Sequence, residues 1–304
     1  MDGVSVSKAI GAGFGLIARR PLAVLAWMAA YLLIGVLPHL GVMALILPQW
    51  IQMMQEVASS AASHTPMPPA AMMRAQMGMM QLQPLAWLVG VASQAILLSA
   101  VYRAVLFPED SRYFYLRLGG RELWVGLVIL VLIVMAALLI LAIALPVGIA
   151  SAILGVVARD TPPVALVIVL LVLAAIGFFL WVLIRLSLAT TMSFADRSFR
   201  LYESWSLTHG QAWNIFLVAL VLVVIAWIAE MVLGGVAISA LGGVYGLQRL
   251  AGWFQHPTFN LAVAMPWLAG GVLAVTVFST LFFVLFGAAW AEIYRELTEE
   301  PAAA

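Results

Sequence analysis

The sequence predicts an all-α, polytopic membrane protein with six transmembrane helices and amphipathic elbow helices at the cytoplasmic surface. Of its 304 residues, 65% are hydrophobic and 9% are charged, and the mean hydropathy is +1.12. A soluble domain would carry about a quarter charged residues. Six apolar runs are each long enough to cross the roughly 30 Å of hydrocarbon in a bilayer. We therefore treat residues 1–304 as a single integral membrane domain.

The six apolar runs define the expected spans. They cover residues 21–47, 84–107, 123–150, 164–187, 213–233 and 266–290. The third run continues without a break to Ala158, and one helix over 123–158 would be about 54 Å long. This length exceeds the roughly 30 Å that one crossing needs. We therefore expect a kink or stop near Pro146–Gly148 and a second, interfacial piece over 149–158.

The basic residues predict which side each turn faces. Positive residues gather in cytoplasmic turns of membrane proteins. If the N-terminus, the turns at 103–121 and 185–212 and the C-terminus are cytoplasmic, eleven of the fourteen basic residues lie there: Lys8, Arg19, Arg20, Arg103, Arg112, Arg117, Arg121, Arg185, Arg197, Arg200 and Arg295. Only Arg74, Arg159 and Arg249 remain outside. With its excess of Arg over Lys and its many Ala residues, the chain is expected in a bacterial inner membrane.

Two segments are expected to be elbow helices on the cytoplasmic surface. One covers residues 4–18, before the first span. The other covers 197–209, where Asp196 would be the N-cap and would pair with Arg200 four residues later. This helix would place Leu201, Trp205 and Thr208 on one face, in the manner of an interfacial amphipathic helix.

A faint repeat relates three cytoplasmic segments. The pairs Leu16 and Leu22, Leu118 and Trp124, and Leu207 and Trp213 share one spacing, with Gly or a basic residue between them. The repeat favours three hairpins, each made of an elbow helix, an outward span and a return span. Chance similarity is the alternative.

The stretches "RLSLA" at 185–189 and "ESWSLTHGQAW" at 203–213 resemble a signature of bacterial six-helix membrane proteins. These are the membrane domain associated with glycerophosphoryl diester phosphodiesterases and its stand-alone, uncharacterised relatives. The matching positions form an elbow motif: Arg185, Ser204, Trp205, Leu207, Thr208 and Gly210. The family pattern has a proline shortly after the Arg-containing stretch, whereas this chain reads "ATTMSF". The resemblance implies no established activity for the membrane domain, and no long soluble segment remains for the phosphodiesterase domain.

The chemistry-bearing residues predict no catalytic group, metal site or cofactor. Glu203, Ser204 and His209 could form a triad, but a helix points residues five apart to different faces, whereas a triad needs mutual hydrogen bonds. The four His residues, at 39, 64, 209 and 256, have no ligand spacing, and the chain has no Cys.

The outer segment 51–83 is rich in Met. Met73, Met77 and Met80 would share one helical face, broken off from the rest by the Pro-rich stretch at 64–71. Thioethers suit Cu(I), but flexible Met side chains also suit an apolar face on the membrane or a partner, which we favour. Paired glycines at 234–235, 242–243 and 270–271 could allow close helix packing.

These observations favour a non-enzymatic protein that acts through membrane lipids, a protein partner or a second copy of itself, in envelope or membrane homeostasis. The net charge of +1 implies no nucleic-acid partner. The alternative is a small transporter or channel, which would need polar groups at mid-membrane. The chain offers Gln94, Ser99, Glu230 and Thr276. Glu230 would either reach outward to Arg249 or Arg159, or lie deeper and act in the membrane interior.

Overall fold

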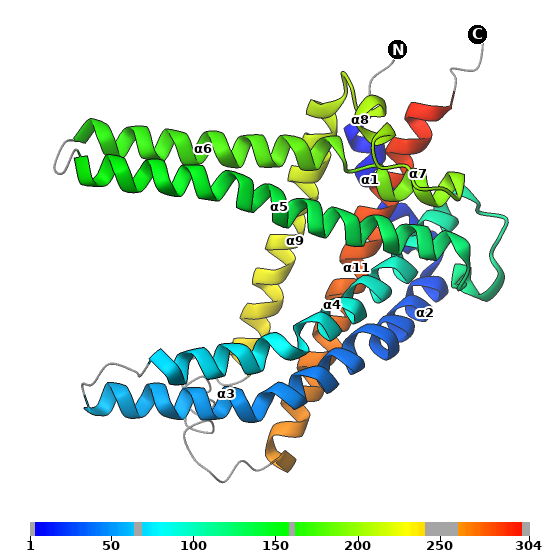
Figure 1. Cartoon of the computed structure of the whole chain (residues 1–304). Helices are drawn as coiled ribbons and strands as arrows, with labels where there is room; N and C mark the ends of the chain where they lie inside the picture. Colours follow the sequence, from blue (N-terminus) through cyan, green and yellow to red (C-terminus); the bar gives the residue numbers. More distant parts are fainter. Residues whose placement is uncertain (1–3, 64–68, 158–161, 241–260, 300–304) are drawn as a thin grey trace.

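The structure is a computed structural model that describes residues 4–63, 69–157, 162–240 and 261–299 (Figure 1). In these ranges it contains helices and turns and no strand. Six helices are long and apolar enough to cross a membrane. The all-α, polytopic fold predicted from composition is therefore confirmed.

The long helices form three hairpins. In the first hairpin, α2 (Pro21–Tyr31), the π-helix η1 (Leu32–Val36) and α3 (Leu37–Ser63) run outward, and α4 (Pro69–Leu106) returns. The second hairpin consists of α5 (Gly120–Val157) and α6 (Pro162–Arg185), and the third of α9 (Ala212–Ala240) and α11 (Leu261–Thr298). The outward and return helices of each hairpin contact each other, so the predicted three-hairpin layout is present.

Four short elements lie at one end of the molecule, which we call the basal end. They are α1 (Val6–Arg19), the 3-10 helix η2 (Arg112–Tyr115), α7 (Ala189–Asp196) and α8 (Glu203–Leu207). The first and last described residues, at the start of α1 and the end of α11, lie at this end too (Figure 1). The backbone N–H of Ser5 donates a 3.0 Å hydrogen bond to Glu296, which ties the two ends of the chain together. The two described ends of the chain therefore lie at the same end of the molecule, as an even number of crossings requires.

Most of the buried core lies at the basal end, and a smaller buried cluster of Val42, Ile46 and Ala86 lies farther out between α3 and α4. On α5 the buried apolar residues are Val125, Val128 and Ile129, and on α9 they stop at Leu222. Beyond these positions the second hairpin diverges from α3 and α4 (Figure 1). The distal halves expose large apolar side chains, such as Leu141 on α5 and Trp227 on α9. Such surfaces suit the hydrocarbon of a bilayer, where apolar side chains need no cover.

Of the kink or stop expected near Pro146–Gly148, the stop was wrong. α5 continues to Val157 with Pro146 inside it, so no separate piece begins at residue 149. α4 begins at Pro69 and includes Pro84, and its apolar part, Met80–Leu106, agrees with the span expected over 84–107. A transmembrane helix tolerates Pro because neighbouring groups and local adjustments satisfy the freed backbone carbonyl. The Met-rich segment is thus largely helical, and Met73, Met77 and Met80 are all exposed.

The elbow before the second hairpin is not an α-helix. Tyr113, Phe114 and Tyr115 have φ of 53°, 53° and 67°, three consecutive residues in the left-handed region. This conformation is costly for residues with a Cβ. Trp27 Nε1 donates a 2.8 Å hydrogen bond to the Phe114 carbonyl, and Arg103 donates to the Tyr115 carbonyl. Side chains from the first hairpin therefore hold the turn that starts the second.

The expected close packing at glycine pairs is absent where the structure describes them. A Cβ on Gly234, Gly235, Gly270 or Gly271 would meet no atom within 4 Å, because the hairpins have already diverged there. The third pair, at 242–243, lies outside the described ranges. Most of the Pro-rich stretch at 64–71 lies outside them as well. Close packing occurs instead at the basal end, where a Cβ on Gly13 of α1 would lie 2.8 Å from Leu285 Cα on α11.

We expect Gly13→Ala to lower the free energy of unfolding by about 1–3 kcal/mol, because its methyl group would press against the backbone of α11. Gly11→Ala in the same helix is the matched control, since a Cβ there meets no atom within 4 Å. It should raise stability by about 0.5–1 kcal/mol through helix propensity. Thermal unfolding in detergent measures both changes, and equal effects would contradict the close approach of α1 and α11.

Candidate functional site

The elbow motif assembles around the carbonyl end of α6. The hydroxyls of Ser204 and Thr208 donate hydrogen bonds of 3.0 and 3.2 Å to the Arg185 carbonyl. The last carbonyls of a helix lack partners within it, and α6 ends at Arg185 in a turn over 186–188, with no proline. The structure thus brings Arg185, Ser204 and Thr208 together and gives the two hydroxyls a structural task.

Aromatic rings cover the Arg185 side chain. Its guanidinium carbon lies 4.9 Å from the centroid of the Trp205 ring, and Trp205 meets Trp181 edge-on at 4.9 Å. Arg185 is buried, and no hydrogen-bond acceptor in the described part of the chain contacts its Nε. The Trp205 face and the carboxyl end of α6 both favour the positive charge.

The predicted helix over 197–209 was wrong. Only Glu203–Leu207 is helical, Arg197 has φ of 54°, and Asp196 is the last residue of α7 rather than an N-cap. The backbone N–H of Arg200 instead donates to the Ser193 hydroxyl at 2.9 Å, which folds this segment back along α7.

Several details of the same segment were correct. Asp196 and Arg200 form the expected ion pair, at 3.1 Å. Leu201 and Thr208 are buried, and Trp205 is half-buried. Gly210 of the elbow motif has φ of 78°, a left-handed value that favours glycine.

The triad hypothesis is contradicted. The Ser204 hydroxyl is buried against the Arg185 carbonyl, Glu203 lies 3.7 Å from Arg200, and His209 is exposed. In the described ranges no hydrogen bond joins any two of Glu203, Ser204 and His209.

We expect Ser204→Ala to lower the free energy of unfolding by about 1–2 kcal/mol, because it removes a buried hydrogen bond to a helix-terminal carbonyl. Ser206→Ala is the control: its hydroxyl donates to the Glu203 carbonyl at 2.8 Å but is exposed, so the change should stay within about 0.5 kcal/mol. Thermal unfolding of both variants in the same detergent checks this. Equal losses would contradict a structural role for Ser204.

No hydrogen bond joins any two of the intramembrane polar residues in the described part of the chain. Gln94 is half-buried, and the hydroxyl of Ser99 is buried with no partner among the described residues. Thr276 donates to the Val272 carbonyl of its own helix at 2.7 Å. Glu230 is exposed on α9 and makes no described ion pair or hydrogen bond. Arg159 and Arg249, its expected partners, lie outside the described ranges.

A buried ion pair at the basal end escaped the sequence analysis. Arg103 on α4 and Glu122 on α5 are both buried and form a salt bridge. The Arg103 guanidinium also lies 5.4 Å from the Phe194 ring on α7. These contacts join the first two hairpins to α7. From the sequence, only a basic residue at the end of one span and an acidic residue at the start of the next are visible. Their pairing depends on how the two hairpins pack.

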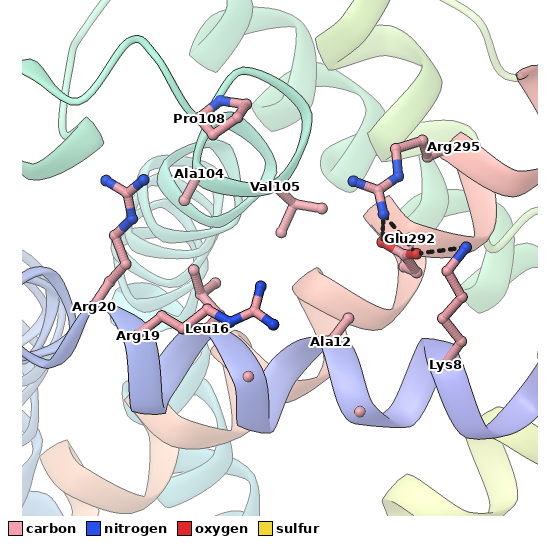
Figure 2. A pocket seen from close by; sticks show the side chains of 12 residues that line it. Lys8, Ala12, Leu16, Arg19, Arg20, Ala104, Val105, Pro108, Glu292 and Arg295 are labelled. Carbon is pink, nitrogen blue, oxygen red and sulfur yellow. Dashed lines mark hydrogen bonds and ion pairs between the residues drawn. The ribbon is translucent and has the colours of Figure 1, made fainter.

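A cavity of about 520 Å³ opens at the basal end between α1, the end of α4 and the end of α11 (Figure 2). Its charged lining residues are Lys8, Arg19, Arg20, Glu292 and Arg295. In the sequence, the four basic residues indicated only which side of the membrane each turn faces. No sequence pattern indicates that these residues lie together, because α1 and α11 are at opposite ends of the sequence.

The cations of the cavity fall into two groups. Glu292 lies 3.3 Å from Lys8 and 2.7 Å from Arg295, and Lys8 is also 3.1 Å from Glu296. Hydrogen bonding to Glu296 and then to Glu292 raises the pKa of Lys8 above its ordinary value.

Arg19 and Arg20 have no carboxylate partner in the described ranges. The Arg20 guanidinium lies 5.3 Å from the Tyr115 ring. One end of the cavity is therefore neutralised, and the other carries free positive charge.

Comparison of the chain with protein-family models, with curated proteins and with solved structures found no match. The resemblance to the membrane domain associated with glycerophosphoryl diester phosphodiesterases therefore stays a prediction, carried by the residues of the elbow motif.

Proposed function

We propose that this is a non-enzymatic, multi-pass protein of the bacterial inner membrane that works through membrane lipids at its basal end. The observation that carries the proposal is the gathering of eleven of the fourteen basic residues at the end where the three hairpins meet. Positive residues next to transmembrane helices attract anionic lipids of the cytoplasmic leaflet. The basal end and both termini would then face the cytoplasm.

Exposed aromatic side chains at the basal end support an interfacial position. Tyr113, Tyr202 and Trp213 are 79%, 76% and 68% exposed. Tyr and Trp favour the headgroup level of a bilayer, where one end of the ring is apolar and the other is wet. Lipids would therefore contact the protein both along the distal halves of the hairpins and around the basal end.

The polar groups at the basal end support a role without catalysis. The hydroxyls of Ser204 and Thr208 hold the end of α6. The carboxylates of Glu122 and Glu292 are buried in ion pairs. Groups held in such contacts stabilise the fold and are not free to attack a substrate. These contacts are consistent with a non-catalytic task in envelope or membrane homeostasis, carried out through bound lipids.

Lipid analysis of the protein purified from native membranes in mild detergent tests this proposal. We expect anionic phospholipids to be enriched in the purified protein relative to the whole membrane extract. A bound lipid composition equal to that of the extract, or a stoichiometric protein partner with no enriched lipid, would overturn it.

A further inference from the structure

The basal cavity has the charge of an anion-binding site. Figure 2 shows Arg19 extending along α1 into the opening, with no contact marked between it and the Lys8–Glu292–Arg295 group. Arg19 is exposed and makes no ion pair or hydrogen bond with any described residue. Arg20, beside it, is half-buried, and its guanidinium lies over the face of Tyr115 with no ion pair to any described residue. Two guanidinium groups on adjacent residues are thus left for an external partner.

The shape of the cavity leaves room for that partner. The α1 side of its wall carries the small residues Gly11, Ala12 and Gly15, and a Cβ on Gly11 or Gly15 would meet no atom within 4 Å. Deeper in the wall, Leu16 and Val105 add apolar surface. Guanidinium groups bind phosphate oxygens through paired, charge-assisted hydrogen bonds. The combination suits a phosphate ester with an apolar remainder.

Apolar residues exposed on α1 and at the start of α2, the two helices next to Arg19 and Arg20, indicate where such a ligand comes from. Phe14 on α1 is 47% exposed and Leu22, at the start of α2, is 67% exposed. These side chains would sit in lipid if α1 lies along the membrane surface. A headgroup could then enter the cavity while its acyl chains stay in the bilayer.

We propose that the cavity between α1, α4 and α11 binds the phosphate group of an anionic phospholipid, with Arg19 and Arg20 as its direct contacts. This inference rests on the proposed function, because it names the lipid class and the place where it binds. Lys8, Glu292 and Arg295 hold α1 against α11 and set the wall of the site. The two arginines supply the charge that selects an anionic headgroup over a zwitterionic one.

The test is a binding titration in zwitterionic detergent with short-chain, dioctanoyl lipids. Dioctanoyl phosphatidylglycerol should bind more tightly than dioctanoyl phosphatidylcholine. Arg19→Gln should weaken binding of the phosphatidylglycerol about tenfold, the size expected for one charge-assisted hydrogen bond. Arg19→Gln combined with Arg20→Gln should weaken it further.

A second variant blocks the cavity without changing charge. Gly15→Leu places a side chain where a Cβ has open space, so the fold should persist while phosphatidylglycerol binding is lost. Arg112→Gln is the matched charge control, because Arg112 is an exposed basal residue that does not line the cavity and has no described partner. It should leave binding unchanged.

Three results would overturn the proposal. They are unchanged binding in Gly15→Leu, an equal loss in Arg112→Gln, and equal binding of soluble glycerol 3-phosphate, which would make the ligand a soluble phosphate instead of a lipid. The proposed function fails separately, if the purified wild-type protein carries no enriched anionic lipid. Enriched lipid that persists in the Arg19 and Arg20 variants would overturn the cavity site alone.

Discussion

Arg103→Met is expected to lower the free energy of unfolding by about 3–5 kcal/mol, because it leaves the buried Glu122 carboxylate without its partner. Only 4% of the Arg103 side chain and 6% of the Glu122 side chain are exposed. Arg103 also donates to the Tyr115 carbonyl in the left-handed turn. Its loss would therefore loosen the junction of the first two hairpins as well. Unfolding by denaturant in mixed micelles measures the change.

Two further variants make this prediction specific. Arg117→Met removes the pair with Asp110, whose side chains are 36% and 35% exposed, and should lower stability by about 1 kcal/mol or less. Arg103→Met combined with Glu122→Leu replaces the buried pair by apolar side chains and should recover most of the loss. A single Arg103→Met variant as stable as Arg117→Met would contradict a buried ion pair.

Trp27→Ala is expected to destabilise the protein by about 3–5 kcal/mol, since it removes one of the largest buried side chains. Trp27 is 0% exposed and packs in the core between the first and third hairpins, with Val284 and Ala288 of α11. Its ring meets Tyr115 edge-on at 6.5 Å, and its Nε1 donates to the Phe114 carbonyl at 2.8 Å. Thermal unfolding in detergent gives the loss.

Trp27→Phe separates the packing from the hydrogen bond. It keeps most of the apolar volume and should cost about 1–3 kcal/mol, mainly because the Phe114 carbonyl loses its donor. Trp87→Ala, at a position 53% exposed on α4, is the control and should have little effect. If Trp27→Ala and Trp87→Ala lose the same stability, the core is not where the structure places it.

The hairpin layout could be predicted because it depends on local properties of the chain. Apolar runs define the spans, and the stretches between them, where the basic residues concentrate, define the turns. The expected stop at Pro146 was wrong because Pro breaks helices in water more readily than inside a membrane. The helix expected over 197–209 failed because a pattern that fits one helical face also fits a segment folded back on α7, through contacts such as that of Arg200 with Ser193.

The sites were harder to predict because they depend on contacts between distant segments. Ser204 and Thr208 were identified as residues of a motif, but the carbonyl that they hold belongs to Arg185, at the end of another helix. The cavity joins α1 to α11, and its free arginines, Arg19 and Arg20, are distinguished only by their lack of carboxylates. Glu292 and Glu296 neutralise Lys8 instead. No local pattern in α1 distinguishes Lys8, which is paired with residues of α11, from Arg19 and Arg20.

The proposed function requires that the basal end, with its basic residues, faces the cytoplasm. Because the chain has no Cys, a single introduced Cys reports its own side without interference. Gln55 on α3 is distal and exposed, and Ser111 is basal and exposed. A membrane-impermeant maleimide should label Gln55→Cys in intact spheroplasts and Ser111→Cys only after lysis. Labelling of Ser111→Cys in intact spheroplasts, with Gln55→Cys protected until lysis, would contradict the account.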